Sequence, residues 1–517
     1  MSRTKKTIKN ARISLIFYIL FTLVAFFSRK IFLDYLGPEF LGLTATVSNI
    51  LGFLNLAELG VGTTIGVFLY KPLYDENHDE INKIISVLGY IYKKIGIIVL
   101  IIAIVVSCFF PLIFSKVTIS LPIIYLCFYV FLTNSLLGYF VNYHQTLLYT
   151  DQKGYIIAIY YQSANLLRII LQSLIAYYYQ SFLLWIILEF IFSIIYAVII
   201  RWKVRQEYLW LKFNLIASKE DLVNYKDIFK KIKQVFFHKF SHVIFTSTDQ
   251  LMIYIYVSLE SVAYYNNYLL VFGKATSLLN NFFEGTKAAI GNLVAENDSK
   301  KIKKVFWEMM ALRFFIGGFL FITLLYLTEP FITLWLGEKY IMDPTILLLL
   351  LISLFLGQII IPIENFLNAY GLFQDIWAPT TQAVLNIIIS IILGKLMGIS
   401  GIILGSILST LLIIVPWKPY FLYSKGFEKS VSEYWIGFFK LAMPFIGTLI
   451  IIKYILFNVV LSDKITTVID WIYLAIKTSI IAVLVYGSLL FIINQGFRDL
   501  FKRFYMMSNN LINKILK

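Results

Sequence analysis

The sequence predicts an all-α integral membrane protein with about fourteen transmembrane helices, arranged as two six-helix lobes followed by two additional helices. Three observations predict this class. Of the 517 residues, 59% are hydrophobic and only 14% are charged, and the mean hydropathy is +0.80. Soluble domains are less apolar and carry more charge. In addition, apolar stretches of spanning length recur along the whole chain, and Lys and Arg gather in alternate loops.

The spans follow from length and hydropathy, since a spanning helix needs roughly 20 mostly apolar residues. The first apolar stretch, 13–27, is followed by basic residues and not by a small-residue cleavage site, so we expect a span and not a cleaved signal peptide. The second stretch is long enough to be tilted or broken, and its glycines make Glu58–Gly62 the expected break. The predicted spans are 12–36, 40–70, 83–110, 121–143, 155–178, 182–201, 234–258, 262–290, 304–328, 345–368, 377–395, 399–416, 433–456 and 469–494.

The distribution of positive charge predicts the orientation. Most Lys and Arg fall in the two tails, in the connector after the sixth span and in the loops on the same side of the membrane. The loops on the other side hold only Lys116, Lys339, Lys395 and Lys464. Positively charged loops stay inside, so both termini are predicted to be cytoplasmic and the protein to lie in a bacterial cytoplasmic (inner) membrane. The net charge of +16 is then an orientation signal and a contact with anionic lipid, rather than a nucleic-acid footprint.

The connector between the sixth and seventh spans has its own signature. Ser218 followed by Glu220 and Asp221 predicts the start of an amphipathic helix on the cytoplasmic interface. No extracytoplasmic loop is long enough for a catalytic domain. The predicted organisation is an N-lobe 1–201, a connector 202–233, a C-lobe 234–417, helices thirteen and fourteen in 418–496 and a basic cytoplasmic tail 497–517.

An internal repeat supports the two lobes. The turn at 35–39 matches 256–260 at a spacing of 221 residues, and Tyr149 matches Tyr370 at the same spacing. Pro111 matches Pro330 at a spacing of 219, which also places Lys94 on Arg313. A nearly constant spacing predicts that spans one to six repeat as spans seven to twelve in the same orientation. Parallel repeats of this kind occur in transporters, with the substrate site between the halves.

Charged side chains inside the predicted spans are the candidate functional residues. A charge at the bilayer centre costs at least roughly 2.5–3.5 kcal/mol, so such residues usually face a bundle interior or a hydrated cavity. Polar residues recur on one face of the second span and on one face of the eighth. These patterns predict a positively lined cavity between the halves that suits a phosphate or diphosphate group. The candidate cavity residues are Arg29, Lys94, Arg168, Asn267, Lys274, Asn281 and Arg313.

Bland readings of single residues were kept beside this one. Glu189 lies close to an otherwise apolar face and fits a structural hydrogen-bonding role as well as a functional one. Lys30 and Lys93 adjoin another basic residue and fit snorkelling or local packing. His238 and His242 are spaced for a metal but lack a glutamate partner motif. We therefore predict no metal site, no cofactor and no enzymatic centre.

Four segments carry a family resemblance: Leu36–Leu43 (LGPEFLGL), Leu56–Gly62 (LAELGVG), Glu329–Gly337 (EPFITLWLG) and Gly398–Ser406 (GISGIILGS). They resemble polysaccharide repeat-unit flippases of the Wzx type, in the polysaccharide transporter branch of the multidrug/oligosaccharidyl-lipid/polysaccharide exporter superfamily. The resemblance covers most of the chain. Its motifs are signatures of the fold rather than reacting residues.

The resemblance implies a function. Such proteins move an undecaprenyl-diphosphate-linked oligosaccharide from the inner to the outer leaflet by alternating access, for surface polysaccharides such as O-antigen, capsule or exopolysaccharide. Arg29 and Lys274 would engage the diphosphate, and helices thirteen and fourteen would offer a groove for the polyprenyl tail. The partners implied are the lipid-linked substrate, the membrane and the polysaccharide assembly machinery. Coupling to an ion gradient is common in the superfamily, and the ion-coupling candidates are Glu58, Asp249, Glu284 and Glu364.

Two alternatives remain open at this point. An ion-coupled multidrug or small-molecule antiporter of the same superfamily would prefer an acidic, aromatic cavity, and the basic excess in the spans disfavours it. A membrane polysaccharide polymerase needs a large extracytoplasmic loop or an acidic interfacial motif, neither of which is present in the sequence. The residues carry no code for the sugar, the coupling ion or the oligomeric state.

Overall fold

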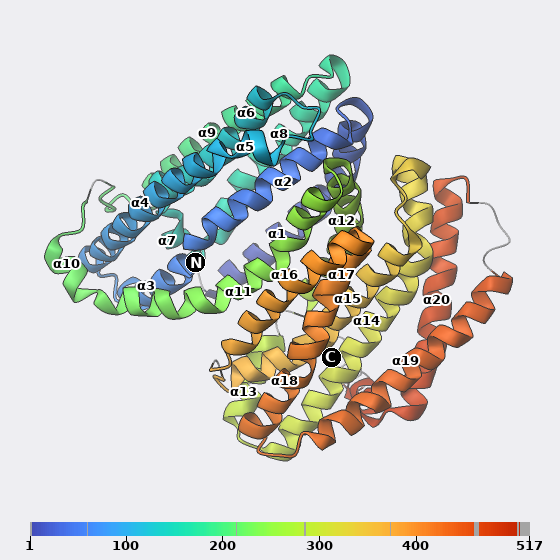
Figure 1. Ribbon diagram of the computed structural model, residues 1–517. Helices are drawn as coiled ribbons and strands as arrows, with labels where there is room; N and C mark the ends of the chain where they lie inside the picture. Colours follow the sequence, from blue (N-terminus) through green and yellow to red (C-terminus); the bar gives the residue numbers. More distant parts are fainter. Residues whose placement is uncertain are drawn as a thin grey trace, which may run out of the picture. The chain divides into compact units, whose positions relative to one another are not determined.

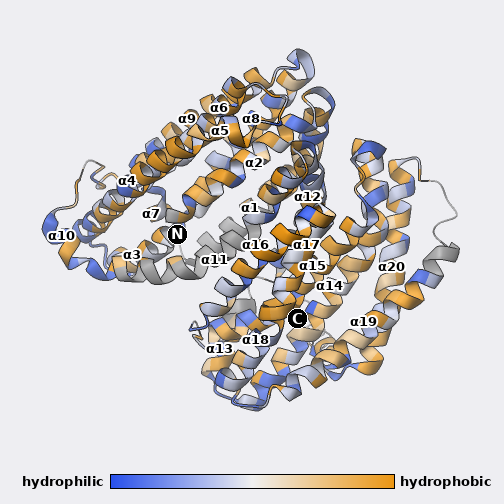
Figure 2. Cartoon of the chain, viewed as in Figure 1, coloured by the Kyte–Doolittle hydropathy of each residue, from blue (hydrophilic) through white to orange (hydrophobic). Residues whose placement is uncertain are grey.

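The computed structural model describes residues 3–58, 60–213, 215–283, 286–372, 374–459, 465–503 and 506. These residues form helices and turns and contain no strand, which confirms the predicted all-α class. They divide into two compact units, residues 1–263 and 264–517 (Figure 1). Figure 2 shows apolar residues along most of the helices and polar residues gathered at their ends.

The first unit begins with a long helix and contains one broken span. Its helices are α1 (Arg3–Tyr35), α2 (Pro38–Leu54), the 3₁₀ turn η1 (Asn55–Glu58), α3 (Val61–Tyr74), α4 (His78–Cys108), α5 (Phe110–Ile113), α6 (Leu121–Phe140), α7 (Gln145–Thr150), α8 (Gly154–Tyr179), α9 (Phe182–Glu207), α10 (Lys219–Asn224) and α11 (Lys226–Tyr256). The break in the second span lies where it was predicted, since α2 ends at Leu54 and Gly60 takes a φ of 90° before α3 begins. Glycine adopts this left-handed conformation without a Cβ clash.

The second unit holds the remaining helices, and α12 begins just before the boundary. These helices are α12 (Leu259–Phe282), α13 (Thr286–Ala295), α14 (Ser299–Leu336), the turn η2 (Glu338–Tyr340), α15 (Pro344–Ala369), α16 (Trp377–Met397), α17 (Ile399–Ser409), the wide turn η3 (Thr410–Ile414), α18 (Val415–Phe421), the wide turn η4 (Leu422–Gly426), α19 (Ser432–Val459) and α20 (Val468–Ile493). The wide turns flank a segment with Pro416 and Pro419, which lack the N–H that a regular helix needs.

Ten of the described helices are long and apolar enough to cross a membrane. The other predicted spans coincide with α2–α3, α8, α11 and α12, and these are the segments that carry the polar residues of the sequence. Their lower hydropathy therefore follows from their polar faces. The architecture is that of a multi-pass membrane protein and agrees with about fourteen transmembrane helices.

The predicted repeat reappears in the order and the ends of the helices. Helices α4 and α14 begin 221 residues apart, at His78 and Ser299, and each is capped by the side chain before it, Asn77 or Asp298. The residue before each cap, Glu76 or Asn297, has a positive φ, at 53° and 56°. The repeat thus extends to local backbone geometry, although the compact units do not follow it strictly, because α11 packs against α2 and α3 of the first unit.

The predicted connector is helical at the position that its sequence suggested. The Ser218 side chain accepts a hydrogen bond from the Asp221 N–H, and the Asp221 carboxylate accepts one from the Ser218 N–H, so α10 starts with a capping box. This hydrogen bonding lowers the pKa of the Asp221 carboxyl. After Tyr225 the chain continues as α11, which runs through residue 233 without interruption.

The loops of the first unit gather at two ends, as the charge pattern predicted. At one end, the 111–118 loop contacts α2 and α11 through Thr118–Glu39 and Tyr254–Ile113 hydrogen bonds. At the other end, the Lys212 N–H donates to Asn82 Oδ1 at 2.7 Å. Burial there lowers the pKa of His144 to about 4, so its side chain is neutral near pH 7. Which end faces the cytoplasm stays a prediction.

Glycines of the resemblance motifs allow close helix packing. In α17, a Cβ on Gly401 would collide with the backbone of Leu393, and a Cβ on Gly405 would collide with Ser390, so α16 and α17 touch along their backbones. This small-xxx-small spacing is a common packing device in membranes. Gly42 in α2 similarly faces the backbone of Leu259 at the start of α12.

Candidate functional site

The interior of the first unit contains a buried ion pair between α8 and α9. Arg168 forms an ion pair with Glu189, and its other terminal nitrogen donates to Asn165 Oδ1 at 2.5 Å. Gln172 Nε2 donates to the second Glu189 oxygen at 3.0 Å. Glu189 is 7% exposed, so the pair satisfies a carboxylate that would otherwise be costly to bury. Glu189 thus neutralises Arg168 and leaves no negative charge over.

Arg29 of α1 lines the same cavity as this pair. The cavity has a volume of about 190 Å³ and is lined by Arg29, Arg168 and Glu189 together with Ser28, Thr44 and Gln172. Two arginines and one glutamate leave it with a net positive charge. Among the described residues, no side chain or carbonyl forms a hydrogen bond or an ion pair with Arg29. A charge that the protein leaves uncompensated within a predicted span is typical of a ligand site.

A second, smaller cavity lies on the other side of the ion pair. It has a volume of about 120 Å³, and Arg168 and Glu189 belong to its wall as well. The neutral polar side chains in this wall are Asn134, Tyr161, Asn165, Ser193 and Tyr196. The ion pair therefore separates two polar spaces inside the first unit.

Glu58 lies at the break of the second span, within a cluster of hydroxyl and amide groups. The Tyr92 hydroxyl donates to Glu58 Oε1 at 3.0 Å. The Tyr139 hydroxyl donates to Asn55 Oδ1 at 2.8 Å, and Asn55 Nδ2 donates to Ser135 Oγ at 3.2 Å. The rings of Tyr92 and Tyr139 stack with centroids 5.7 Å apart. This arrangement can hold a carboxylate in either protonation state, since hydroxyls donate and accept.

The second unit contains one of the predicted cationic residues in a fully polar setting. Arg313 of α14 is 4% exposed and donates to Asn280 at 2.8 Å and to Gln358 at 2.9 Å. Its guanidinium also lies 5.5 Å from the centre of the Phe283 ring. These partners are neutral, and none of the carboxylates in the described residues forms an ion pair with Arg313. Arg313 therefore keeps its positive charge inside the helix bundle.

The other predicted site residues of the second unit are placed in α12 and α15. Lys274 is half-buried in α12. Asn267 is fully buried, and its amide has no hydrogen-bond partner among the described residues. Glu364 is exposed in α15. Glu284 lies outside the described residues, as does the side chain of Asn281.

Two predicted residues of the first unit lie away from the cavity of Arg29. Lys94 is exposed on α4, with its ammonium 4.6 Å from the centre of the Tyr90 ring. Asp249 is half-buried in α11. The structure thus brings Arg29 and Arg168 together, while a common site for the whole predicted set stays a prediction.

Sequence reasoning missed the neutral partners of these charges. Asn165 and Gln172 lie three residues before and four residues after Arg168, a helical spacing that places all three on one face. That signal was present in the sequence. Tyr92 and Tyr139 carried no comparable signal, because the chain has 35 tyrosines and nothing in their spacing points to Glu58.

Comparisons with known proteins reveal the fold but no close relative. No family model matches the chain. No curated protein matches it significantly. Among solved structures, the chain is similar to the lipid II flippase MurJ in an inward closed conformation, with 16% sequence identity and a TM-score of 0.65. That match covers 92% of this chain and 99% of MurJ.

Multidrug transporters of the same superfamily show the fold as well. An inward-facing MATE family transporter of the MOP superfamily matches with 14% identity and a TM-score of 0.54, covering 78% of this chain and 93% of the transporter. A MOP superfamily transporter from Pyrococcus furiosus, described as having a binding pocket of reverse polarity, matches with 14% identity and a TM-score of 0.51, covering 82% of this chain and 97% of its own. The chain therefore has the fold of MOP superfamily transporters.

Proposed function

We propose that this protein is a flippase that moves an undecaprenyl-diphosphate-linked oligosaccharide repeat unit from the inner to the outer leaflet of the bacterial cytoplasmic membrane. It works by alternating access and serves the biosynthesis of a surface polysaccharide. Both termini lie in the cytoplasm, because the basic loops and tails stay inside. The protein is a transporter and catalyses no covalent step.

The observation that carries this proposal is the uncompensated charge of Arg29. Glu189 is already neutralised by Arg168, so the cavity beside Arg29 offers a positive charge with free donor positions. Guanidinium groups bind phosphate oxygens through paired hydrogen bonds. An anionic diphosphate is therefore the ligand chemistry that this cavity favours, and the likeness to a lipid II flippase supports a lipid-linked substrate.

The remaining candidates extend this site toward the second unit. Arg313 and Lys274 supply further positive charge, and Asn267, Asn281 and Lys94 supply donors along the substrate path. Glu58, held by Tyr92, is the preferred ion-coupling residue because its partner tolerates both protonation states. Asp249, Glu284 and Glu364 are the alternatives for that role.

A second candidate function is an ion-coupled multidrug antiporter. The fold of MATE transporters and the aromatic, acidic cluster around Glu58 favour it. An organic cation would, however, be repelled from the cavity of Arg29 and Arg168. The two candidates therefore predict opposite ligand charges for the first unit.

The deciding experiment removes the charge of Arg29 and leaves its neighbour intact. In a deletion strain complemented with Arg29→Ala, we expect surface polysaccharide export to fall at least about tenfold, because a charge-assisted hydrogen bond contributes roughly 1.5–3 kcal/mol. Lys30→Ala is the matched control, since Lys30 is exposed on the same helix and pairs with Asp34 at 3.3 Å. The measurements are surface polysaccharide and the lipid-linked oligosaccharide that accumulates inside.

Normal export by Arg29→Ala at normal protein level would overturn the flippase proposal. Loss of resistance to cationic dyes in the deletion strain, with unchanged polysaccharide, would favour the antiporter instead.

A further inference from the structure

A large pocket lies at the end of the first unit where three turns meet. These turns join α1 to α2, α5 to α6 and α11 to α12, and all three are predicted to be extracytoplasmic. The pocket has a volume of about 690 Å³, within the range of small-molecule sites. We call it the outer pocket. Its charged lining residues are Glu39, Lys116 and Glu260.

The outer pocket is separate from the cavity of Arg29, and α2 forms the wall between them. Leu41 and Thr44 line the cavity of Arg29, whereas Glu39, Thr46 and Ile50 line the outer pocket. At 100° per residue, these two sets occupy opposite faces of the helix. One helix thus presents a different face to each of two chemically different spaces.

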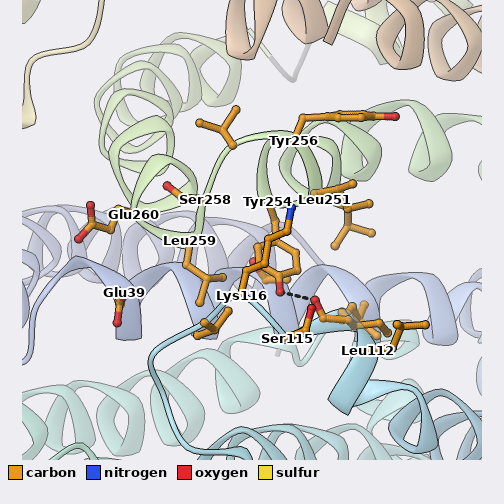
Figure 3. A pocket seen from close by; sticks show the side chains of 16 residues that line it. Glu39, Leu112, Ser115, Lys116, Leu251, Tyr254, Tyr256, Ser258, Leu259 and Glu260 are labelled. Carbon is orange, nitrogen blue, oxygen red and sulfur yellow. Dashed lines mark hydrogen bonds between the residues drawn. The ribbon is translucent and has the colours of Figure 1, made fainter. Parts of the chain in front are cut away.

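The acidic side of the outer pocket is built by repeat-related turns. Glu39 and Glu260 are 221 residues apart and occupy the same position in the two matching turns. Figure 3 shows both carboxyl groups on one side of the pocket, with Ser258 beside Glu260. Glu39 accepts a hydrogen bond from Thr118, and Glu260 has no partner among the described residues. Acceptor positions on both carboxylates therefore remain open toward the pocket.

The rest of the lining is apolar and aromatic, with one ammonium. Lys116 reaches into the pocket from the side away from the carboxylates (Figure 3). Leu112, Leu251 and Leu259 form apolar wall between them. Tyr254 is fixed in place, because its hydroxyl donates to the Ile113 carbonyl at 2.6 Å and its ring contacts Phe114 at 5.4 Å.

This combination selects against simple ions. Two carboxylates against one ammonium disfavour a phosphate, and the ammonium inside the pocket disfavours a bare cation. A carbohydrate fits better, because its hydroxyls donate to carboxylates and accept from an ammonium, while the C–H face of a sugar ring packs on apolar and aromatic side chains. We propose that the outer pocket binds carbohydrate, as a site for the glycan part of the cargo on the outer side. The source of that carbohydrate rests on the proposed function.

The test measures shielding of a cysteine placed in the pocket. The full-length protein carries Cys108→Ser, Cys127→Ser and Ser115→Cys, since Ser115 is exposed and lines the pocket. The rate of its modification by an impermeant maleimide is measured in lipid nanodiscs. The probes are the repeat-unit oligosaccharide released by acid from the strain's own surface polysaccharide, maltotetraose, inorganic pyrophosphate and tetraethylammonium.

We expect the repeat-unit oligosaccharide to slow modification at least about threefold at twice its Kd, because an occupied pocket is blocked. Pyrophosphate and tetraethylammonium should have no effect. Glu260→Ala should remove most of the protection, while Glu338→Ala, an exposed carboxylate in another turn, should keep it. A cysteine at Thr466 controls for general effects of the probes.

The proposal is overturned if neither oligosaccharide protects Ser115→Cys, or if pyrophosphate or tetraethylammonium protects it instead. This assay involves no translocation, so its failure is distinct from that of the flippase proposal. Protection together with normal export by Arg29→Ala would retain the outer pocket and reject the flippase. Absence of protection with defective export would do the reverse.

Discussion

The cavity of Arg29 and the outer pocket lie on opposite faces of α2, yet their charges have different meanings. Arg29 lies within a predicted span, where an unpaired charge costs at least roughly 2.5–3.5 kcal/mol. Glu260 lies in a turn at the end of the unit, where water solvates a carboxylate at little cost. An uncompensated charge is therefore strong evidence for a ligand in the first case and weak evidence in the second. The outer pocket needs its volume and mixed lining as support.

The same contrast separates residues that the repeat makes equivalent. Lys94 and Arg313 occupy matching positions in α4 and α14. Lys94 is exposed, with an aromatic ring as its neighbour, whereas Arg313 is buried and bonded to two amides. Sequence equivalence thus carries over the helix but not the environment of the side chain, and only the buried member of the pair has the cost that marks a functional residue.

The largest predicted effect concerns the ion pair that balances the cavity of Arg29. Glu189→Gln leaves Arg168 buried without a counter-charge, and breaking a buried pair in this way costs about 3–5 kcal/mol. We expect a clear loss of thermal stability in detergent, followed by fluorescence-detected size exclusion. Glu338→Gln, at an exposed carboxylate, is the control.

The double variant Arg168→Gln with Glu189→Gln separates stability from charge. It removes both charges, so we expect stability to recover toward that of the natural protein. Wild-type stability of Glu189→Gln alone would mean that water reaches the pair, and the contrast between the two faces of α2 would then lose its physical basis.

Much of the fold could be predicted, because the bilayer leaves its mark on local sequence. Span length, the break at Gly60 and the cap at Ser218 each depend on residues within a few positions of one another. The repeat was visible because its spacing stays nearly constant. The paired ends of α4 and α14 then followed, including caps that the sequence comparison had not used.

The site was predictable only in part, because pairing depends on how neighbouring helices are rotated. The cost of burial marked Arg29, Arg168 and Glu189 as notable, but nothing local indicated that Glu189 neutralises Arg168 and leaves Arg29 alone. The outer pocket was not predicted at all. It requires turns around residues 39, 116 and 260 to meet, and that meeting is a property of tertiary packing.

The next effect in size tests α2 as the wall between the two spaces. A Cβ on Gly42 would meet the backbone of Leu259, which has little room to move. Gly42→Ala should therefore destabilise the protein by about 1–3 kcal/mol through overpacking. Gly52→Ala is the matched control in the same helix, since nothing lies within 4 Å of its added Cβ. Thermal unfolding of both variants provides the measurement.

The two glycine variants should move in opposite directions. Gly52→Ala gains helix propensity of roughly 0.5–1 kcal/mol, so its stability should stay level or rise. Equal losses in both variants would show that α2 tolerates no side chain at either position, and the close contact with Leu259 would not be the cause.

The smallest effect is confined to the outer pocket. Tyr254→Phe removes the hydrogen bond to the Ile113 carbonyl and keeps the contact with Phe114. A neutral hydrogen bond contributes about 0.5–1.5 kcal/mol, so the 111–118 loop should open more often and Ser115→Cys should react several-fold faster with maleimide, while thermal stability and Arg29-dependent export stay unchanged. Tyr256→Phe is the control, because Tyr256 lines the same pocket without a hydrogen bond to any described residue. Faster reaction in Tyr254→Phe alone would show that the loop closes the outer pocket through this bond. A matching fall in export would instead couple the two faces of α2, and the two spaces would then act as one path.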